Sequence, residues 1–257
     1  MKLKTFLIVG CLGGIFTLSS CTAPTSLIDY NPFIGPGGHG HTFPGAVVPH
    51  GMIQPSPDTR IDGWDACSGY YHADSTINGF SHTHVSGTGC CDYGDVLFMP
   101  TVGKQQYLTT DPQGQTLAYA SAFSHENETA EPGYYYVCLD TYQVKAEISA
   151  TKRGAIHRYT FPESSEAGFI LDLDYSLQRQ TNSDMGIEVI SDTEICGHKK
   201  TTYWAFDQYI NFYAKFSKPF SYTLVTDSIT MDNVSGFLSA KFYYTLIPPK
   251  MNKYWLK

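Results

Sequence analysis

Residues 134–161 read YYYVCLDTYQVKAEISATKRGAIHRYTF, and this stretch decides the fold. Its apolar runs are broken by single polar residues in an alternating pattern, in Tyr134–Leu139, Val144–Ala150 and Ala155–Phe161. A period of two is typical of half-buried antiparallel strands, because successive side chains point to opposite faces of a sheet. The stretch therefore predicts three consecutive strands joined by short turns.

Further runs of the same kind follow at Phe169–Leu173, Gly186–Ile190, Glu194–Gly197, Tyr209–Phe216 and Leu238–Thr245. Strands that recur at intervals of about 8–15 residues, with turn residues and no amphipathic helix between them, indicate an all-β fold. We expect an antiparallel β-sandwich. The N-terminal third differs, because residues 31–95 are dense in Gly, Pro, His, Ser and Asp. Such a long loop-rich segment usually carries function.

Composition narrows the class of protein. The 257 residues include 17 Lys and Arg against 24 Asp and Glu, a net charge of -7, and 16% are charged while 14% are aromatic. Disordered chains, coiled coils and polybasic nucleic-acid binders have more charge or less aromatic surface than this. The length fits one large domain or two small ones. We expect no nucleic-acid partner.

The N-terminus has the pattern of an export signal. Lys2 and Lys4 precede an apolar run, Phe6–Leu18, that is too short to span a bilayer. Small residues directly before Cys21 are typical of a bacterial lipoprotein box, in which that cysteine becomes lipidated; a plain secretory signal is the alternative. We expect a signal peptide at 1–20, a tether at 21–28, and an exported lipoprotein of the periplasm or outer membrane, held by acyl chains alone.

Five cysteines remain after the signal and the lipidation site are set aside: Cys67, Cys90, Cys91, Cys138 and Cys196. An odd number leaves at least one free thiol, so the sequence predicts no disulfide framework, although a single bridge is compatible with it. The adjacent pair Cys90-Cys91 lacks the spacing of zinc or redox motifs.

Two loop motifs carry residues suited to ligand binding. Five glycines occur within eleven residues of the segment NPFIGPGGHGHTFPG (31–45), where backbone can approach a ligand closely and His39 can hydrogen-bond to it. The pattern of a phosphate-binding loop is absent, and a structural turn is the alternative. The second motif is GWDACSGY (63–70), in which Trp64 and Asp65 offer an apolar face and an acceptor, as a sugar site needs. A buried structural tryptophan is the alternative there.

The third motif, GFSHTHVSGTG (79–89), places His82 and His84 two residues apart. On a strand they would share one face and could bind a metal or orient a polar network. The pattern H-x-H lacks a nearby acidic residue at a recognised spacing, so we favour hydrogen-bonded histidines and expect no metal. No serine-hydrolase elbow is present around Ser86.

Four aspartates in these motifs are available as carboxylates for glycoside hydrolysis: Asp58, Asp65, Asp92 and Asp95. A glycosidase needs two carboxyl groups at a defined separation across the bond. Capping of loop N–H groups is the commoner fate of aspartate in such segments, and the spacing alone does not decide between these roles.

Taken together, the motifs resemble the opening domain of the glycoside hydrolase family 92 exo-α-mannosidases. The strings that carry the resemblance are NPFIGPGGHGHTFPGA, QPSPDTR, GWDACSGY, INGFSHTHVSGTG, DYGDVLFMPTVG, FSHENETAEPGYYYV, ATKRGAIHRYTFPE and FSKPF, in order from Asp29 to Phe220. Pro36 replaces a threonine that is typical of the family. The resemblance implies a galactose-mutarotase-like β-sandwich packed against a larger (α/α)6 barrel, a calcium-dependent inverting mechanism, and mannose-containing glycans as substrate.

The resemblance also implies roles for residues. The general acid and base and most calcium ligands are expected on the barrel, to which nothing in this chain corresponds, so we expect no catalytic residue and no metal ligand here. Sandwich loops that complete the sugar subsite make His39, Trp64, Asp65 and Cys67 the expected substrate-binding residues. His82, His84 and Asp95 are expected to support those loops.

The segment LIPPKMNKYWLK (246–257) departs from the strand pattern. Some of the codon choices that can encode this segment give the alternating sequence NTTENEQVLVK when they are read in a shifted frame. We therefore expect the sandwich to cover residues 29–245 and hypothesise a frameshift near Thr245; a genuine ending is the alternative. The nucleotide sequence distinguishes them.

Three functions follow as hypotheses. The first is the sandwich domain of an exported α-mannosidase, inactive without a barrel supplied in cis or in trans. The second is a stand-alone carbohydrate-binding lipoprotein without catalysis. The third is a fragment without function whose barrel-facing surface is exposed and prone to aggregate.

Overall fold

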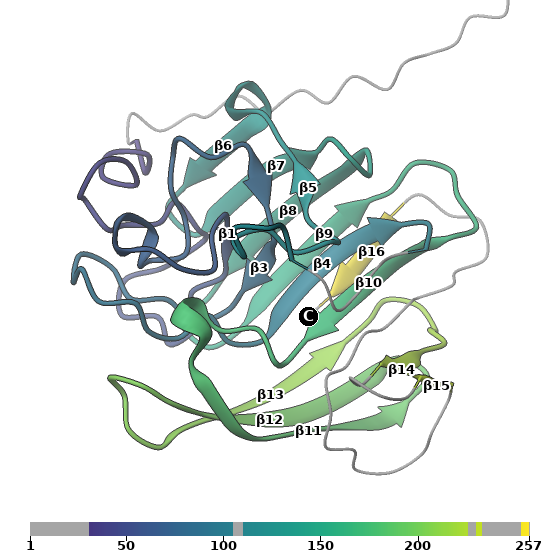
Figure 1. The fold of residues 1–257 in the computed structure, drawn as a ribbon. Coiled ribbons are helices and arrows are strands. Elements are labelled where there is room, and N and C mark those ends of the chain that lie inside the picture. The colour runs from purple at the N-terminus through teal and green to yellow at the C-terminus, as the bar shows by residue number, and fades with distance from the viewer. Residues whose placement is uncertain (1–30, 105–109, 226–229, 233–252, 257) are drawn as a thin grey trace, which may run out of the picture.

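The structure, a computed structural model, describes residues 31–104, 110–225, 230–232 and 253–256. All strand pairs in these ranges are antiparallel, and the helical segments there are single 3-10 turns, so the predicted all-β class is confirmed (Figure 1). No helix in the described ranges has the length and apolar character needed to cross a membrane. The expected signal peptide, tether and strand at 238–245 lie outside the described residues.

Residues 134–161 form the centre of a five-stranded sheet. Its order is β16 (Lys253–Leu256), β9 (Ala155–Thr160), β8 (Val144–Ala150), β7 (Tyr134–Leu139) and β6 (Glu128–Glu131). Every second residue of β8 is buried, as the alternation predicts. β16 belongs to the segment 246–257, and residues 253–256 of that segment pair with β9.

A four-stranded sheet is built from β1 (Ser56–Asp58), β3 (Gly79–Ser81), β4 (Leu97–Val102) and β10 (Ala167–Asp172). All six residues of β10 are buried, although this strand is at the end of its sheet. β1 and β3 are short and lie within the loop-rich N-terminal third, as expected for residues 31–95.

Aromatic side chains join the two sheets into one core. The Phe80 ring on β3 lies 6.3 Å from the rings of Tyr135 and Tyr159 on the five-stranded sheet. The Phe169 ring on β10 lies 4.9 Å from that of Tyr159. Contacts between rings on facing sheets are what a sandwich core requires, so the expected β-sandwich is confirmed.

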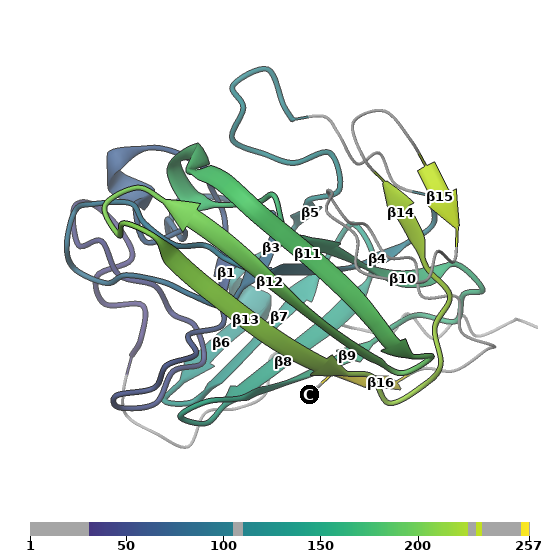
Figure 2. The same cartoon turned by 90° about the horizontal axis from the view of Figure 1, so that it is seen from below.

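A three-stranded sheet lies below the other two sheets in the view of Figure 1 and in front of them in Figure 2. It consists of β11 (Thr181–Ser191), β12 (Glu194–Thr202) and β13 (Gln208–Lys215), longer strands than the sequence predicts for the first two. The ring of Phe216, just after β13, lies 6.3 Å from Phe169. The remaining elements are β2 (Thr76–Ile77) with β5 (Ser121–Ala122), β14 (Thr223–Val225) with β15 (Thr230–Asp232), and the 3-10 turns η1 (Trp64–Ala66), η2 (His125–Asn127) and η3 (Leu177–Arg179).

Candidate functional site

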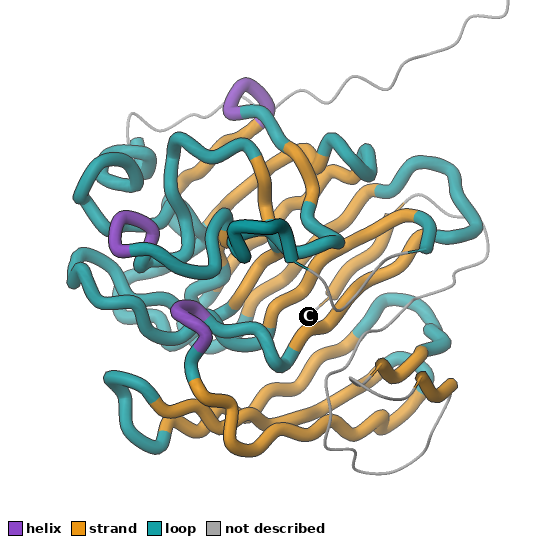
Figure 3. The backbone as a smooth tube through the Cα atoms, in the orientation of Figure 1, coloured by secondary structure: helices purple, strands orange, loops and turns teal. Residues whose placement is uncertain are grey.

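The loops that carry the sequence motifs gather at one end of the sandwich (Figure 3). η1 lies there, and its first residue, Trp64, follows Gly63, whose φ of 117° is readily adopted only by glycine. No atom lies within 4 Å of the position where a side chain on Gly63 would begin, so the turn opens to solvent. As a result Trp64 is 58% exposed, which excludes the alternative of a buried structural tryptophan.

His39 and Asp65 flank this indole. His39 Nδ1 lies 2.5 Å from Asp65 Oδ1, and the His39 ring centroid lies 5.0 Å from that of Trp64. The two polar side chains are 72% and 36% exposed. An aromatic face beside a fixed acceptor and an imidazole is the arrangement that binds the C–H face and the hydroxyls of a sugar.

Cys67 lies beneath this surface rather than on it. Its N–H bonds to the carbonyl of Trp64 at 3.3 Å, and its side chain is 1% exposed. Burial raises the pKa of the Cys67 thiol, which keeps it neutral. The structure thus brings His39, Trp64 and Asp65 together at the surface and places Cys67 under them, where it packs.

His41 is a residue that sequence reasoning did not select. Its ring meets the Trp64 ring edge-on at 4.4 Å, its side chain is 7% exposed, and its Nε2 has no partner among the described residues. Gly89 packs against both rings: a Cβ added there would lie 3.2 Å from His41 and 3.3 Å from Trp64 Nε1. The sequence His39-Gly40-His41 places two histidines close together, but this spacing does not show which of them points inward.

His82 and His84 do not share a strand face, so that expectation is wrong. β3 ends before His82, and the chain then turns. His82 contacts the Val96 carbonyl at 2.6 Å and His157 Nε2 at 3.0 Å, and burial lowers the pKa of His82 to about 4. His84 Nε2 instead lies 2.7 Å from Asp58 Oδ1. Both histidines therefore connect the loop to the core through hydrogen bonds, the role that the sequence favours over metal binding.

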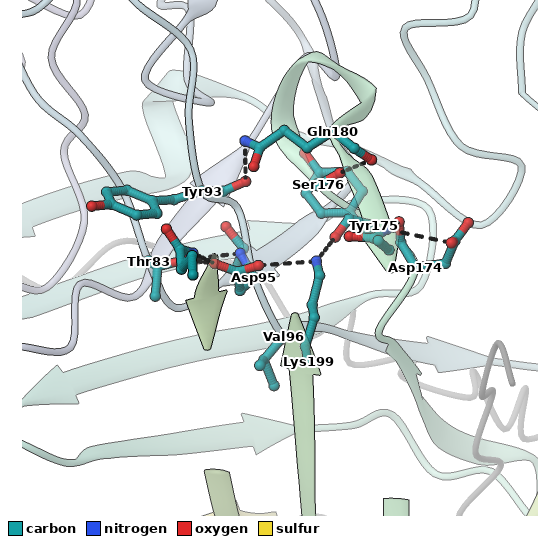
Figure 4. A network of polar contacts seen from close by, with 12 residues as sticks. Thr83, Tyr93, Asp95, Val96, Asp174, Tyr175, Ser176, Gln180 and Lys199 are labelled. Carbon is teal, nitrogen blue, oxygen red and sulfur yellow. Dashed lines mark hydrogen bonds and ion pairs between the residues drawn. The ribbon is translucent and has the colours of Figure 1, made fainter. Parts of the chain in front are cut away.

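Asp95 joins the motif loop to the three-stranded sheet (Figure 4). Thr83 Oγ1 donates to its Oδ2 at 2.7 Å, and so does Gln208 Nε2 at 2.6 Å. Lys199 Nζ lies 3.0 Å from its Oδ1 and also donates to the carbonyl of Tyr175. Lys199 points inward from β12 and, like Asp95, is fully buried. The ion pair between Lys199 and Asp95 is shielded from solvent, and it fixes the motif loop against the three-stranded sheet.

Of the four candidate carboxylates, only Asp65 reaches the surface. Asp58 and Asp95 are fully buried, and the two oxygens of Asp92 accept the N–H groups of Tyr93 and Ala205. Three of the four therefore stabilise loops through hydrogen bonds and ion pairs, as aspartates in turns commonly do. Within the described ranges, no three His, Cys, Asp or Glu side chains converge in a way that could hold a metal ion.

A polar cavity of about 190 Å³ is lined by none of these surface residues. Its lining is Thr59, Arg60, Ala73, Asp74, Ser75, Thr76, Gln115 and Thr116. Arg60 Nε and one terminal nitrogen both donate to Asp74, at distances between 2.7 and 3.0 Å. Because this carboxylate neutralises the guanidinium, the cavity offers no free charge to an anion.

The sequence and the structure of this chain were compared with those of known proteins. The sequence profile of the glycosyl hydrolase family 92 N-terminal domain matches residues 30–242. A family 92 α-mannosidase from Bacteroides thetaiotaomicron, solved with mannoimidazole, superposes with a TM-score of 0.78 at 34% identity over 88% of this chain and 31% of that one. A family 92 inverting mannosidase from the same species gives 0.71 at 26% identity, over 88% and 30% of the two chains.

A more distant relative is an uncharacterized secreted glycosidase of Arthroderma benhamiae. It is 28% identical over 136 residues, which are 51% of this chain and 17% of that protein. The chain therefore spans less than a third of the length of these relatives, and the matched part carries the Trp64 turn and the loops around it.

Proposed function

The chain belongs to glycoside hydrolase family 92 through that family's N-terminal domain, and from this membership we propose that it binds a mannose unit of a glycan at the Trp64 turn and completes the substrate site of an α-mannosidase. The observation that carries the proposal is the exposed Trp64 ring with His39 and Asp65 already in contact beside it. Such a preformed aromatic and polar surface orders a sugar at little entropic cost.

The proposal assigns binding, and not bond cleavage, to this chain. Inverting hydrolysis needs a protonated carboxyl group and a second carboxylate that activates water. Asp65 alone among the four candidates is positioned to reach a ligand, and it is held by His39. The catalytic acid and base then come from an (α/α)6 domain supplied in cis or in trans.

Calcium, which the family resemblance implies, does not fit the described part of this chain as a bound ion. No cluster of three acidic or histidine side chains converges within the described ranges. We therefore assign calcium to the partner domain and derive no step of the reaction from it here.

Hydrolysis of an aryl α-mannoside tests this division of roles. We expect the purified chain to give no turnover with calcium present. Clear turnover that survives repurification would show that the catalytic carboxylates lie within this chain, and the proposal would be wrong.

Glycan binding tests the sugar site itself. We expect weak binding of mannosides, and the substitution Trp64→Ala should abolish it; calorimetry measures both. Tight binding by the chain alone would favour the second candidate, a stand-alone carbohydrate-binding lipoprotein, which the completeness of the His39–Asp65 contact within one chain supports.

We also propose that the chain is exported and anchored by lipid at Cys21. The lipoprotein pattern before this cysteine and the secreted glycosidase among the relatives support export. Labelling with a radioactive fatty acid should mark the wild-type chain and not Cys21→Ser. Equal labelling of the two would contradict the anchor.

A further inference from the structure

Two of the three tryptophans in this chain are exposed. Trp64 is 58% exposed, and Trp204, in the turn between β12 and β13, is 66% exposed. Tryptophan is the largest apolar side chain and is mostly buried in proteins, so two such exposures indicate surfaces that are used for binding.

Hydrogen bonds and an ion pair hold the backbone of the turn that carries Trp204. The Ala205 N–H donates to Asp92 Oδ2 at 2.7 Å, and Gln208, at the start of β13, donates to the buried Asp95 at 2.6 Å. Lys200 and Asp207 form an ion pair of 2.8 Å across the turn. The backbone is therefore fixed while the side chain of Trp204 extends into solvent.

The same contacts bring Trp204 close to the Trp64 turn. Asp92, which binds the Ala205 N–H, directly follows Cys91, whose thiol donates to the Gly63 carbonyl at 3.7 Å. Gly63 directly precedes Trp64. Figures 1 and 2 agree that the β12–β13 turn and η1 lie at the same end of the molecule.

The surroundings of Trp204 suit a sugar. The Tyr203 ring meets the Trp204 ring edge-on, at 6.5 Å and 85°, and extends the exposed aromatic surface. The ion pair between Lys200, near the end of β12, and Asp207, in the turn, supplies charged groups beside it. An exposed indole on a fixed backbone, beside polar groups, offers a face for the C–H surface of a sugar and partners for its hydroxyls, whereas protein-docking surfaces have fewer charged residues at their centre.

We propose that the turn Tyr203–Asp207 is a second sugar-binding surface, where Trp204 stacks on a further unit of the glycan whose mannose lies at Trp64. This inference rests on the proposed function and sharpens it: the ligand is an oligosaccharide or polysaccharide of at least two units, and not a free mannoside.

Affinity electrophoresis in gels with and without α-mannan, together with ligand-observed NMR of methyl α-mannoside, tests the inference. We expect Trp204→Ala to weaken retention by mannan about tenfold, since loss of one stacked ring contributes about 1.4 kcal/mol, while binding of the monosaccharide changes less than about twofold. Trp64→Ala should weaken both. Tyr213→Ala, which removes an exposed ring from the outer face of β13, is the matched control and should change neither.

The outcomes separate the two proposals. If wild-type protein binds and Trp204→Ala is retained equally well, the second surface is wrong and the Trp64 site stands. If the wild type binds neither probe, both fail. If instead the wild type self-associates in sedimentation velocity and Trp204→Ala is monomeric, the turn is a protein-docking surface, and the inference is overturned.

Discussion

At the scale of single residues, Gly89 controls the geometry around Trp64. Its φ of 67° is unfavourable for other residues, and an added Cβ would meet both His41 and the Trp64 ring nitrogen. Gly89→Ala should lower the free energy of unfolding by about 2–4 kcal/mol, from backbone strain and overpacking together. It should also weaken mannan binding, because the indole must move. Chemical denaturation and gel retention measure the two effects.

Gly87 supplies the control for this prediction. It has a similar φ, 74°, but nothing lies within 4 Å of an added Cβ. Gly87→Ala should cost about 1–2 kcal/mol from the backbone alone and leave glycan binding unchanged. If both variants lose binding equally, contact with Trp64 is not the reason that Gly89 is needed.

Residue types predicted part of the site and missed the rest. Trp64 with Asp65 could be recognised because an indole beside a carboxylate suits a sugar wherever the turn lies. The inward position of His41 depends on its packing against Gly89 in a later loop, and the local sequence carries no record of that contact. Nor does the motif around Cys67 show that its side chain is buried.

At the scale of elements, the buried pair between Lys199 on β12 and Asp95 connects a sheet to the motif loops. Lys199→Met should destabilise the protein by about 3–5 kcal/mol, because the carboxylate would remain buried without its cation. Adding Asp95→Asn should restore part of this loss. Urea denaturation of the single and double variants measures the coupling.

Lys215 is the matched control on the same sheet. It pairs with Glu194 at 2.6 Å in solvent, so Lys215→Met should cost less than about 1 kcal/mol. A similar loss in both lysine variants would mean that burial of the Lys199 pair does not matter. Sequence alternation predicted only Glu194–Gly197 of β12 and stopped before Lys199, because a lysine gave no reason to expect an inward position; that reason is a carboxylate about a hundred residues away.

At the scale of the whole molecule, the pH dependence of stability follows from two buried histidines. Burial lowers the pKa of His82 to about 4 and that of His157 well below its usual value, so the folded protein keeps both neutral. The unfolded chain takes up protons below about pH 6.5. Stability should be complete above that pH and fall by about 1.4 kcal/mol per unit and per group as pH drops toward 4.

Urea denaturation at pH 7 and pH 5 checks this slope, and His82→Gln should make it shallower. His125 works in the opposite direction, because its hydrogen bond to Glu128 raises its pKa, and that contribution is present at low pH and lost as pH rises. A wild-type stability that does not change between pH 7 and pH 5 would contradict the neutral histidine pair.

The pairing of β16 with β9 has a consequence for how separate molecules meet. β9 bonds to β8 on one side, and four residues of β16 occupy its other side. An uncovered strand edge presents a row of backbone donors and acceptors to which a second molecule can add a strand. Removing residues 253–257 should therefore increase the association of the protein with rising concentration, and light scattering of the intact and shortened chains would detect the difference. In this protein a four-residue strand covers the β9 edge, which would otherwise be open to a strand of a second molecule.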